Sequence, residues 1–155
     1  MKIRLISIGN KMPDWVTQAY NNYHKRLTGS IALELVEIPL NKRGKNADIK
    51  RLMDKESQQM LAAIPPRYRV VCLDVKGKSL STEGLAKKLA NYEQHGDNIA
   101  LLVGGPEGLH PNCLARADER WSLSSMTLPH PMVRVILSEQ IYRAWSINTG
   151  HPYHR

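Results

Sequence analysis

The stretch IALLVGGPEG, residues 99–108, decides the fold of this chain. The five apolar residues Ile99–Val103 predict a buried strand, and the glycines that follow predict a turn at its carboxyl end. A ligand can approach the backbone closely at a glycine because no Cβ stands in the way. We therefore expect a small-molecule pocket to begin where this strand ends.

The region downstream of this turn supplies a second loop for the same pocket. After a short polar helix, the sequence predicts a short strand over residues 121–124 and then the turn Leu128-Pro129-His130-Pro131. Each proline ring fixes its own φ and restricts the residue before it, so the turn around His130 is expected to be rigid. Two preformed loops after two strands place the expected chemistry at the carboxyl edge of a sheet.

Upstream, strands and helices alternate along the chain. Ser81 is a suitable N-cap for one of the helices, and Gly96 is suited to end it. The absence of repeats and low-complexity linkers indicates one α/β domain over residues 1–155, built on a parallel sheet flanked by helices. The strands are predicted over Lys2–Ile8, Ala32–Ile38 and residues 69–75, and the helices over residues 14–27, 49–64 and 82–95.

The last predicted helix, residues 132–148, differs from the others because apolar residues cover most of its circumference. A helix that is apolar on more than one face is expected to be buried on more than one face. One of these faces is predicted to pack on a second copy of the chain, which predicts a homodimer. Burial entirely within one chain is the alternative.

Charge is the informative part of the composition. Lysine and arginine number 22 against 14 aspartate and glutamate residues, which gives a net charge of +8. Such a balance favours a polyanionic partner such as a nucleic acid, although a merely basic surface is the alternative. Lys42, Arg43 and Lys45 cluster around Gly44, and a glycine-containing loop with three cations is typical of a phosphate-contacting segment.

Several classes of protein and site are disfavoured. No segment has the roughly 20 consecutive apolar residues of a membrane span, and the N-terminus does not resemble a signal peptide. Cys72 and Cys113 form no CxxC pair, so we expect a soluble cytoplasmic protein with reduced thiols. The turn at residues 104–108 has the wrong spacing for a dinucleotide fingerprint, and neither a Walker A motif nor a nucleophile elbow is present. No metal site is expected, since the H-x-x-H pair at the C-terminus has no further ligand nearby in sequence.

The C-terminal residues combine several functional groups. His151, Tyr153, His154 and Arg155 bring together a possible general base, a ring for stacking and a ligand for phosphate. A frayed terminus without function is the alternative interpretation.

Six runs of sequence resemble the bacterial RlmH (YbeA) family. Together they extend over essentially the whole chain, and several are long and rare enough to be specific. The runs are KMPDW at 11–15, GKNADIK at 44–50, VGGPEGL at 103–109, LPHPMVRV at 128–135, YRAW at 142–145 and HPYHR at 151–155.

This resemblance implies a SPOUT-class methyltransferase whose C-terminal part forms a trefoil knot. Members are homodimers that use S-adenosylmethionine to methylate N3 of a pseudouridine in 23S ribosomal RNA. The expected substrate is the large-subunit rRNA within the assembled ribosome. By resemblance, the methyl donor contacts Leu73, Gly104 and the run Leu123-Ser124-Ser125-Met126-Thr127-Leu128. Gly105 is included among the expected donor-contacting residues because it also lets the donor lie against the backbone. Replacing Gly104 by valine is expected to block donor binding without disturbing the fold.

The acceptor chemistry assigns roles to the remaining candidates. The imide nitrogen of the acceptor must lose a proton, so a base or a charge-stabilising group is required. His130 and His154 are candidate bases, and Arg155 is a candidate anion stabiliser. The RNA-binding candidates are Lys42, Arg43, Lys45, Tyr153, His154 and Arg155. Two other functions stay open from the sequence: a nucleotide- or NAD-dependent α/β enzyme on small substrates, and a non-catalytic RNA-binding protein of the ribosome.

Overall fold

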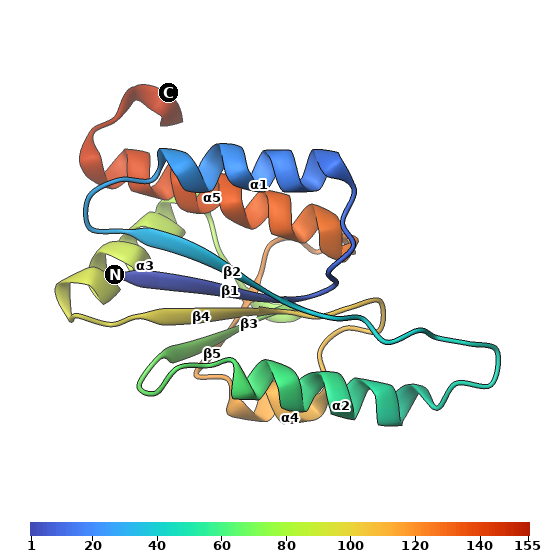
Figure 1. Ribbon diagram of the computed structural model, residues 1–155. Helices are drawn as coiled ribbons and strands as arrows, with labels where there is room; N and C mark the ends of the chain where they lie inside the picture. The colour runs from blue at the N-terminus through green and yellow to red at the C-terminus, as the bar shows by residue number, and fades with distance from the viewer.

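The computed structural model describes residues 1–155, and its strands form one sheet with helices on both faces (Figure 1). The predicted alternation of strands and helices is confirmed. The strands are β1 Lys2–Ile8, β2 Ala32–Ile38, β3 Arg69–Ser79, β4 Ile99–Val103 and β5 Glu119–Ser122. The helices are α1 Asp14–Arg26, α2 Ile49–Ala62, α3 Thr82–Gln94, α4 Pro111–Arg116 and α5 His130–Thr149, followed by the 3-10 helix η1 Pro152–His154.

All neighbouring strands run parallel, in the order β2-β1-β4-β3-β5. The predicted fold class, a parallel α/β sheet flanked by helices, is confirmed. Parallel strands end at the same edge of a sheet, and β4, β3 and β5 are neighbours in this order. The loops that follow these three strands therefore lie close together.

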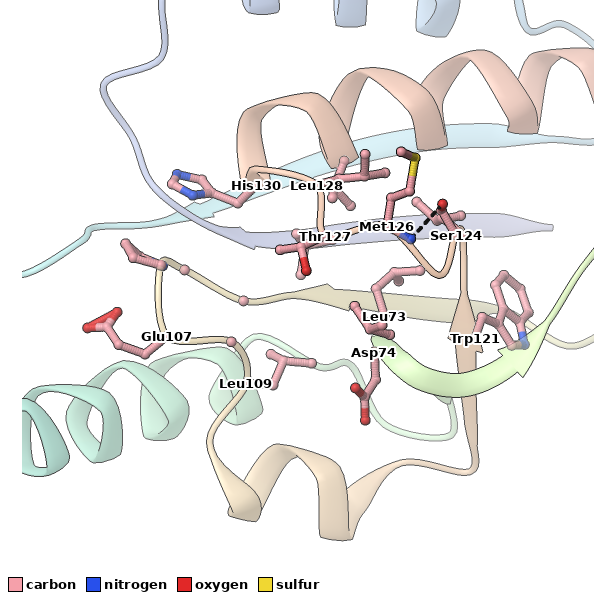
Figure 2. Close-up of a pocket in the computed structure, with 18 of the residues that line it drawn as sticks. Leu73, Asp74, Glu107, Leu109, Trp121, Ser124, Met126, Thr127, Leu128 and His130 are labelled. Atoms are coloured by element: carbon pink, nitrogen blue, oxygen red, sulfur yellow. Dashed lines mark hydrogen bonds between the residues drawn. The ribbon is translucent and has the colours of Figure 1, made fainter.

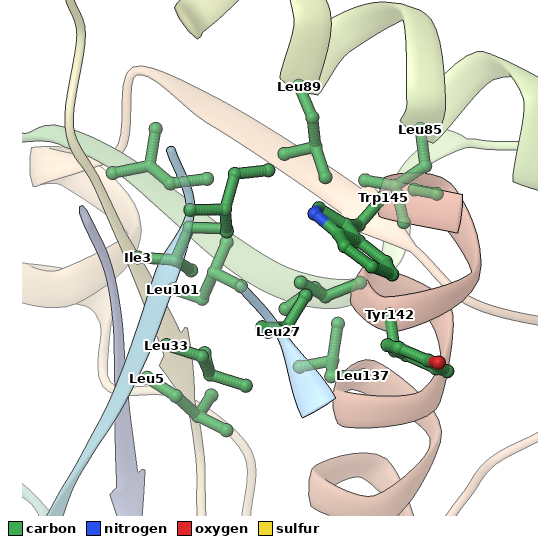
Figure 3. Packing of buried hydrophobic residues seen from close by; sticks show 14 of the residues in the cluster. Ile3, Leu5, Leu27, Leu33, Leu85, Leu89, Leu101, Leu137, Tyr142 and Trp145 are labelled. Atoms are coloured by element: carbon green, nitrogen blue, oxygen red, sulfur yellow. The ribbon is translucent and has the colours of Figure 1, made fainter. Parts of the chain in front are cut away.

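The helices form two layers, with α1, α3 and α5 on one face of the sheet and α2 and α4 on the other (Figure 1). Successive strand residues point to opposite faces. In β4, Leu101 packs in the larger cluster with Leu137 of α5, whereas Leu102 packs in the smaller cluster with Met60 of α2. Figure 3 shows the larger cluster, in which Trp145 fills the space between the strands and α3. Both faces of β4 are buried, which explains its uninterrupted apolar sequence.

Helix ends follow the local sequence signals. The Ser81 hydroxyl accepts a hydrogen bond from the Gly84 N–H at 2.9 Å and caps α3, as predicted. Gly96, just beyond the C-cap of α3, adopts a φ of +73°, in the left-handed region that favours glycine. Asp48 caps α2 by accepting a hydrogen bond from the Arg51 N–H at 3.2 Å.

Two strand boundaries differ from the prediction. β3 continues to Ser79, four residues beyond its predicted end, and β5 occupies Glu119–Ser122 rather than residues 121–124. Both Leu73 and Lys78 of β3 pair with Trp121, so the residues between them form a bulge. The strand continues past the bulge because Gly77 lies against β5, where a Cβ would stand 2.7 Å from the Arg120 carbonyl carbon.

Helix α5 begins at His130, two residues before its predicted start, with Pro131 tolerated in its first turn. It packs against both α1 and α3. Its apolar circumference is thus largely buried within one chain, and this pattern alone does not require a second copy. Arg134, which the sequence pattern placed among the polar residues of the helix, is only 2% exposed. Its guanidinium donates to Glu37 at 2.8 Å and to the Gly9 carbonyl at 3.0 Å.

No helix combines the length and apolarity that a bilayer crossing requires. The C-terminal trefoil knot that the resemblance implies stays a prediction, since strand order and pairing do not define the threading of the chain.

Candidate active site

A cavity of about 330 Å³ lies at the carboxyl ends of β3, β4 and β5 (Figure 2). Its volume is in the range of small-molecule sites. Four segments form its walls: the end of β3 with its bulge, the glycine turn (residues 104–108), the 123–128 loop and the first turn of α5. This is the edge of the sheet where the sequence placed the chemistry.

Most of the predicted donor-contacting residues border this cavity. Ser125 does not: it is exposed, and its neighbour Ser124 accepts a hydrogen bond from the Met126 N–H at 3.0 Å (Figure 2). Met126 is 74% exposed and stands at the mouth of the cavity. The predicted residues that line the cavity are Leu73, Gly104, Gly105, Leu123, Ser124, Met126, Thr127, Leu128 and His130.

The glycines of the turn serve the packing of the chain itself. A Cβ on Gly104 would stand 2.5 Å from the Gly108 carbonyl carbon, so the close approach is between two backbone segments of the same turn. A Cβ on Gly105 would lie 3.2 Å from the Ile8 Cγ2. The expectation that Gly104→Val leaves the fold intact is therefore wrong, because a side chain there collides with backbone before it reaches a ligand.

Two carboxylates that the sequence reasoning missed also line the cavity. Asp74 follows Leu73 at the start of the β3 bulge, and Glu107 lies within the glycine turn (Figure 2). Both are acidic residues at the carboxyl end of a predicted strand, a signal that was available in the sequence. No lysine or arginine lines the cavity, although the chain carries +8 overall. The cavity is thus suited to a positively charged ligand rather than to phosphates.

His130 borders the cavity from the first turn of α5 (Figure 2). Burial lowers its pKa below the usual range, and the nearby Arg134 guanidinium lowers it further. A histidine with a lowered pKa is neutral near pH 7 and able to accept a proton. Of the three catalytic candidates, His130 is the one that lines the cavity.

The predicted phosphate-contacting cations lie in the basic segment (residues 42–51) but differ in their surroundings. Lys42 and Lys45 are exposed and form no ion pair. Arg43 instead donates to Glu56 at 2.5 Å and to Glu107 at 2.8 Å. Its charge is therefore engaged within the chain, and the phosphate-contacting prediction is supported by the exposure of Lys42 and Lys45 alone.

The tail (residues 151–155) packs on the opposite end of α5. The Tyr153 ring lies 4.5 Å from the Tyr142 ring, and the Arg143 guanidinium lies 5.1 Å from the Tyr153 ring. The His154 Nδ1 is 3.2 Å from the Ser146 hydroxyl. These contacts hold the tail against the protein, which is not the arrangement of a frayed terminus.

The candidate residues therefore fall into two groups in one chain. His130 opens α5 beside the cavity, whereas His154 and Arg155 follow the far end of this 20-residue helix (Figure 1). At 1.5 Å per residue the two ends are about 30 Å apart. One chain alone does not bring the tail to its own cavity.

Comparison with known proteins identifies relatives over the full length of the chain. A family model described as "Predicted SPOUT methyltransferase" matches residues 1–154. A protein of Marinomonas sp. (strain MWYL1) named "Ribosomal RNA large subunit methyltransferase H" is 57% identical over 155 residues, covering all of both chains. A protein of the same name from Alkalilimnicola ehrlichii is also 57% identical and covers all of this chain and 99% of its own.

A solved structure resembles the fold at much lower sequence identity. It is a "probable methylase family protein" from Haemophilus influenzae Rd KW20, with a TM-score of 0.56 and 14% identity. The match covers 99% of this chain and 70% of the other. At this identity the similarity concerns the fold alone, and it agrees with the parallel sheet and its helices.

Proposed function

The chain belongs to the SPOUT methyltransferase family and, within it, to the ribosomal RNA large subunit methyltransferase H family, and from this we propose its substrate and donor. It is an enzyme that methylates large-subunit ribosomal RNA. The proposed reaction transfers the methyl group of S-adenosylmethionine to N3 of a pseudouridine in 23S rRNA, with the assembled ribosome as the substrate.

The charge of the cavity is the observation that carries the choice of donor. S-adenosylmethionine has a sulfonium and an ammonium group, and the Asp74 carboxylate, which lines the cavity and forms no ion pair, suits these cations. Glu107 also lines the cavity, but its carboxylate is paired with Arg43. The apolar residues Leu73, Leu109 and Leu128 provide a surface for an adenine ring. A dinucleotide would place its pyrophosphate beside the unpaired Asp74 carboxylate in a cavity that no lysine or arginine lines, which disfavours a NAD-dependent enzyme.

The cavity residues mainly position the donor. When bound, S-adenosylmethionine supplies a methyl group already activated by the sulfonium charge. The backbone of the 123–128 loop and the glycine turn provides hydrogen-bonding groups that hold a ligand in a fixed orientation, and orientation alone contributes a large share of the rate in such reactions.

The acceptor requires removal of a proton. His130 lines the cavity with a lowered pKa, so it is the proposed base nearest the donor. Tyr153, His154 and Arg155 are proposed to contact the acceptor base, with Arg155 stabilising the negative charge that develops on it.

The distance between the two groups supports a homodimer. No tail residue lines the cavity of its own chain, and the tail packs against residues 142–146 of α5, so a second copy is needed to bring the two together. Exposed apolar side chains lie on or near the cavity side of the molecule, as a contact with a second copy requires. They are Met126 at 74%, Val75 at 51%, Trp15 at 51% and Met132 at 37% exposure.

The RNA is proposed to lie along the basic segment. Lys42 and Lys45 are exposed in the connection from β2 to α2, which leaves the sheet at the same carboxyl edge as the cavity (Figure 1). Phosphates held there leave the neighbouring cavity accessible to a nucleotide of the same RNA. An enzyme that acts on ribosomes is expected in the cytoplasm.

Methyl incorporation tests the proposal directly. Ribosomes that lack the modification are incubated with the protein and tritiated S-adenosylmethionine, and the labelled nucleoside is identified by mass spectrometry. Calorimetry with S-adenosylmethionine and with NAD runs in parallel. Binding of NAD in place of S-adenosylmethionine, or label in any nucleoside other than N3-methylpseudouridine, would contradict the proposal.

A further inference from the structure

The glycine turn forms one wall of the cavity but has few internal supports. Its three glycines, Gly104, Gly105 and Gly108, have no side chains to anchor it, and Gly108 adopts a φ of +82°. Within the turn, the Gly108 N–H donates to the Gly105 carbonyl at 3.0 Å. A flexible wall holds a ligand weakly unless something outside the turn fixes it, because ordering the wall then costs free energy on binding.

The polar side-chain anchor of this turn is the contact between Glu107 and Arg43. The Arg43 Nε donates to the Glu107 carboxylate at 2.8 Å, across 64 residues of sequence. Glu107 is the only residue of the turn whose side chain forms a hydrogen bond or ion pair. On the apolar side, a Cβ on Gly105 would be 3.5 Å from the Leu40 Cδ1, so the same connection also packs against the turn.

Arg43 is itself held firmly in place. It donates to both carboxylate oxygens of Glu56, at 2.5 and 2.8 Å, and to the Asn41 carbonyl at 2.8 Å. Glu56 is 1% exposed and also accepts the Asn41 N–H at 2.9 Å. Burial alone would raise the pKa of Glu56, but the hydrogen bonds from Arg43 and Asn41 lower it on balance, so the carboxylate stays ionised. A bidentate arginine–carboxylate pair of this kind sets the direction of the guanidinium.

We propose that Arg43 is a positioning residue for methyl transfer, which fixes the glycine turn by pairing with Glu107 and thereby shapes the donor cavity. The inference rests on the proposed function, in which that cavity binds S-adenosylmethionine. Arg43 thus acts inward, on the donor side, while its neighbours Lys42 and Lys45 face the RNA. Arg43 therefore differs from the lysines of the basic segment in the residues that it contacts, although all of them carry the same charge.

A double-mutant cycle tests this assignment. The variants are Glu107→Gln, Arg43→Lys and the two combined. Glu107→Gln leaves Arg43 paired with Glu56, so no buried charge loses its partner. Arg43→Lys keeps the positive charge of the segment and a partner for Glu56, but a single ammonium group does not reproduce the guanidinium fork that joins Glu56 to Glu107. Lys55→Gln, at an exposed lysine beside Glu56 without an ion pair, is the matched control for loss of one charge.

The measurements are the Kd of S-adenosylmethionine by calorimetry, and KM for the donor and kcat in methyl transfer to ribosomes. We expect each single variant to weaken donor binding about tenfold, the range of a charge-assisted hydrogen bond. The double variant should be no weaker than Glu107→Gln, because both act through one contact. KM for the donor should rise, whereas kcat at saturating donor should stay within about twofold of the wild-type value. Lys55→Gln should bind the donor like wild type.

Three results would overturn the inference. Additive losses in the double variant would show that Arg43 acts independently of Glu107. Unchanged donor affinity with weaker ribosome binding in Arg43→Lys would return Arg43 to the RNA-contacting group. A Glu107→Gln protein that binds the donor like wild type would remove the anchor role, even if Arg43→Lys proved too unstable to purify. Failure of the wild-type protein to bind S-adenosylmethionine would instead contradict the proposed function itself.

Discussion

The two ends of α5 are built in different ways. At its first residue, His130 meets a cavity whose walls are backbone turns and loops at the ends of three strands. Toward its C-terminal end, side chains do the packing: Tyr142 and Trp145 stack with ring centres 5.4 Å apart, and Tyr153 packs on Tyr142. The first end has the form of a ligand site, whereas the second presents cations and rings on a packed surface. The difference agrees with the proposal that a donor half and an acceptor half meet between two chains.

Removing the His154 and Arg155 side chains of the tail should have the largest effect. We expect His154→Ala combined with Arg155→Ala to slow methyl transfer by about 100-fold or more, because proton transfer and charge stabilisation at the acceptor are lost. The calorimetric affinity for S-adenosylmethionine should stay at the wild-type value, since these residues lie far from the cavity of their own chain. A full rate of tritium incorporation would show that the tail has no part in the chemistry.

Mixing two inactive variants tests whether the cavity of one chain works with the tail of another. Thr127→Trp fills the cavity from an exposed loop position and should abolish donor binding. Mixed with the tail variant and allowed to exchange subunits, it should recover about a quarter of the wild-type activity, because about half of the dimers are mixed and each holds one intact site. Light scattering should give about twice the 17.6 kDa chain mass. No recovery on mixing, or a monomer at micromolar concentration, would contradict a site shared between chains.

The backbone packing at the cavity end predicts a stability effect of intermediate size. Gly104→Ala should lower the free energy of unfolding by about 1–3 kcal/mol, because its Cβ would stand 2.5 Å from the Gly108 carbonyl carbon. Gly44→Ala is the matched control, since a Cβ there has no atom within 4 Å. Urea denaturation measures both. Equal stability of the two variants would show that the backbone of the turn shifts to accommodate the Cβ at little cost.

His130 should give the stability of the protein a pH dependence. Its pKa in the folded protein is lowered from the ordinary 6.5, mainly by burial, so the unfolded chain binds the proton first. Stability should therefore rise with pH between the lowered pKa and about 6.5, and fall on acidification through that window. The difference in unfolding free energy between wild type and His130→Gln, followed from pH 7.5 to 5, should shrink as the pH falls. A difference that is independent of pH would contradict this.

The smallest expected effect concerns the exposed cations near the cavity end. Lys42→Gln should weaken ribosome binding modestly and reduce the slope of log affinity against log salt by about 1. Lys87→Gln, an exposed lysine on α3, is the control and should leave the slope unchanged. Equal changes in both variants would indicate a diffuse basic surface instead of a defined RNA path.

Much of the fold was accessible from local sequence. The uninterrupted apolar run of β4 predicted a buried strand, and Ser81 and Gly96 marked the ends of α3 through cap chemistry. These signals work because strand burial and helix caps depend on residues close together in the chain. The continuation of β3 to Ser79 was missed because it depends on the fit of Gly77 against Arg120, a contact between distant segments.

The candidate site shows the same division. Its position at the strand ends, its glycines and His130 followed from motif and topology. The acidic lining was missed because Asp74 and Glu107 belong to no motif that fixes where a side chain points. The burial of Arg134 was missed because a helical pattern counts it as polar.

Local sequence patterns were enough to predict the order of strands and helices and the edge of the sheet where the cavity lies, because apolar periodicity, caps and glycine turns act over a few neighbouring residues. Sequence motifs were enough to predict the family. Only the tertiary structure decided which charges serve the fold and which stay free for a partner. Arg43 meets Glu107 across 64 residues and Arg134 meets Glu37 across 97, while Lys42 meets no acid at all. The energy of an ion pair depends on distance and burial in space, and neither is encoded in the spacing of residues along the chain.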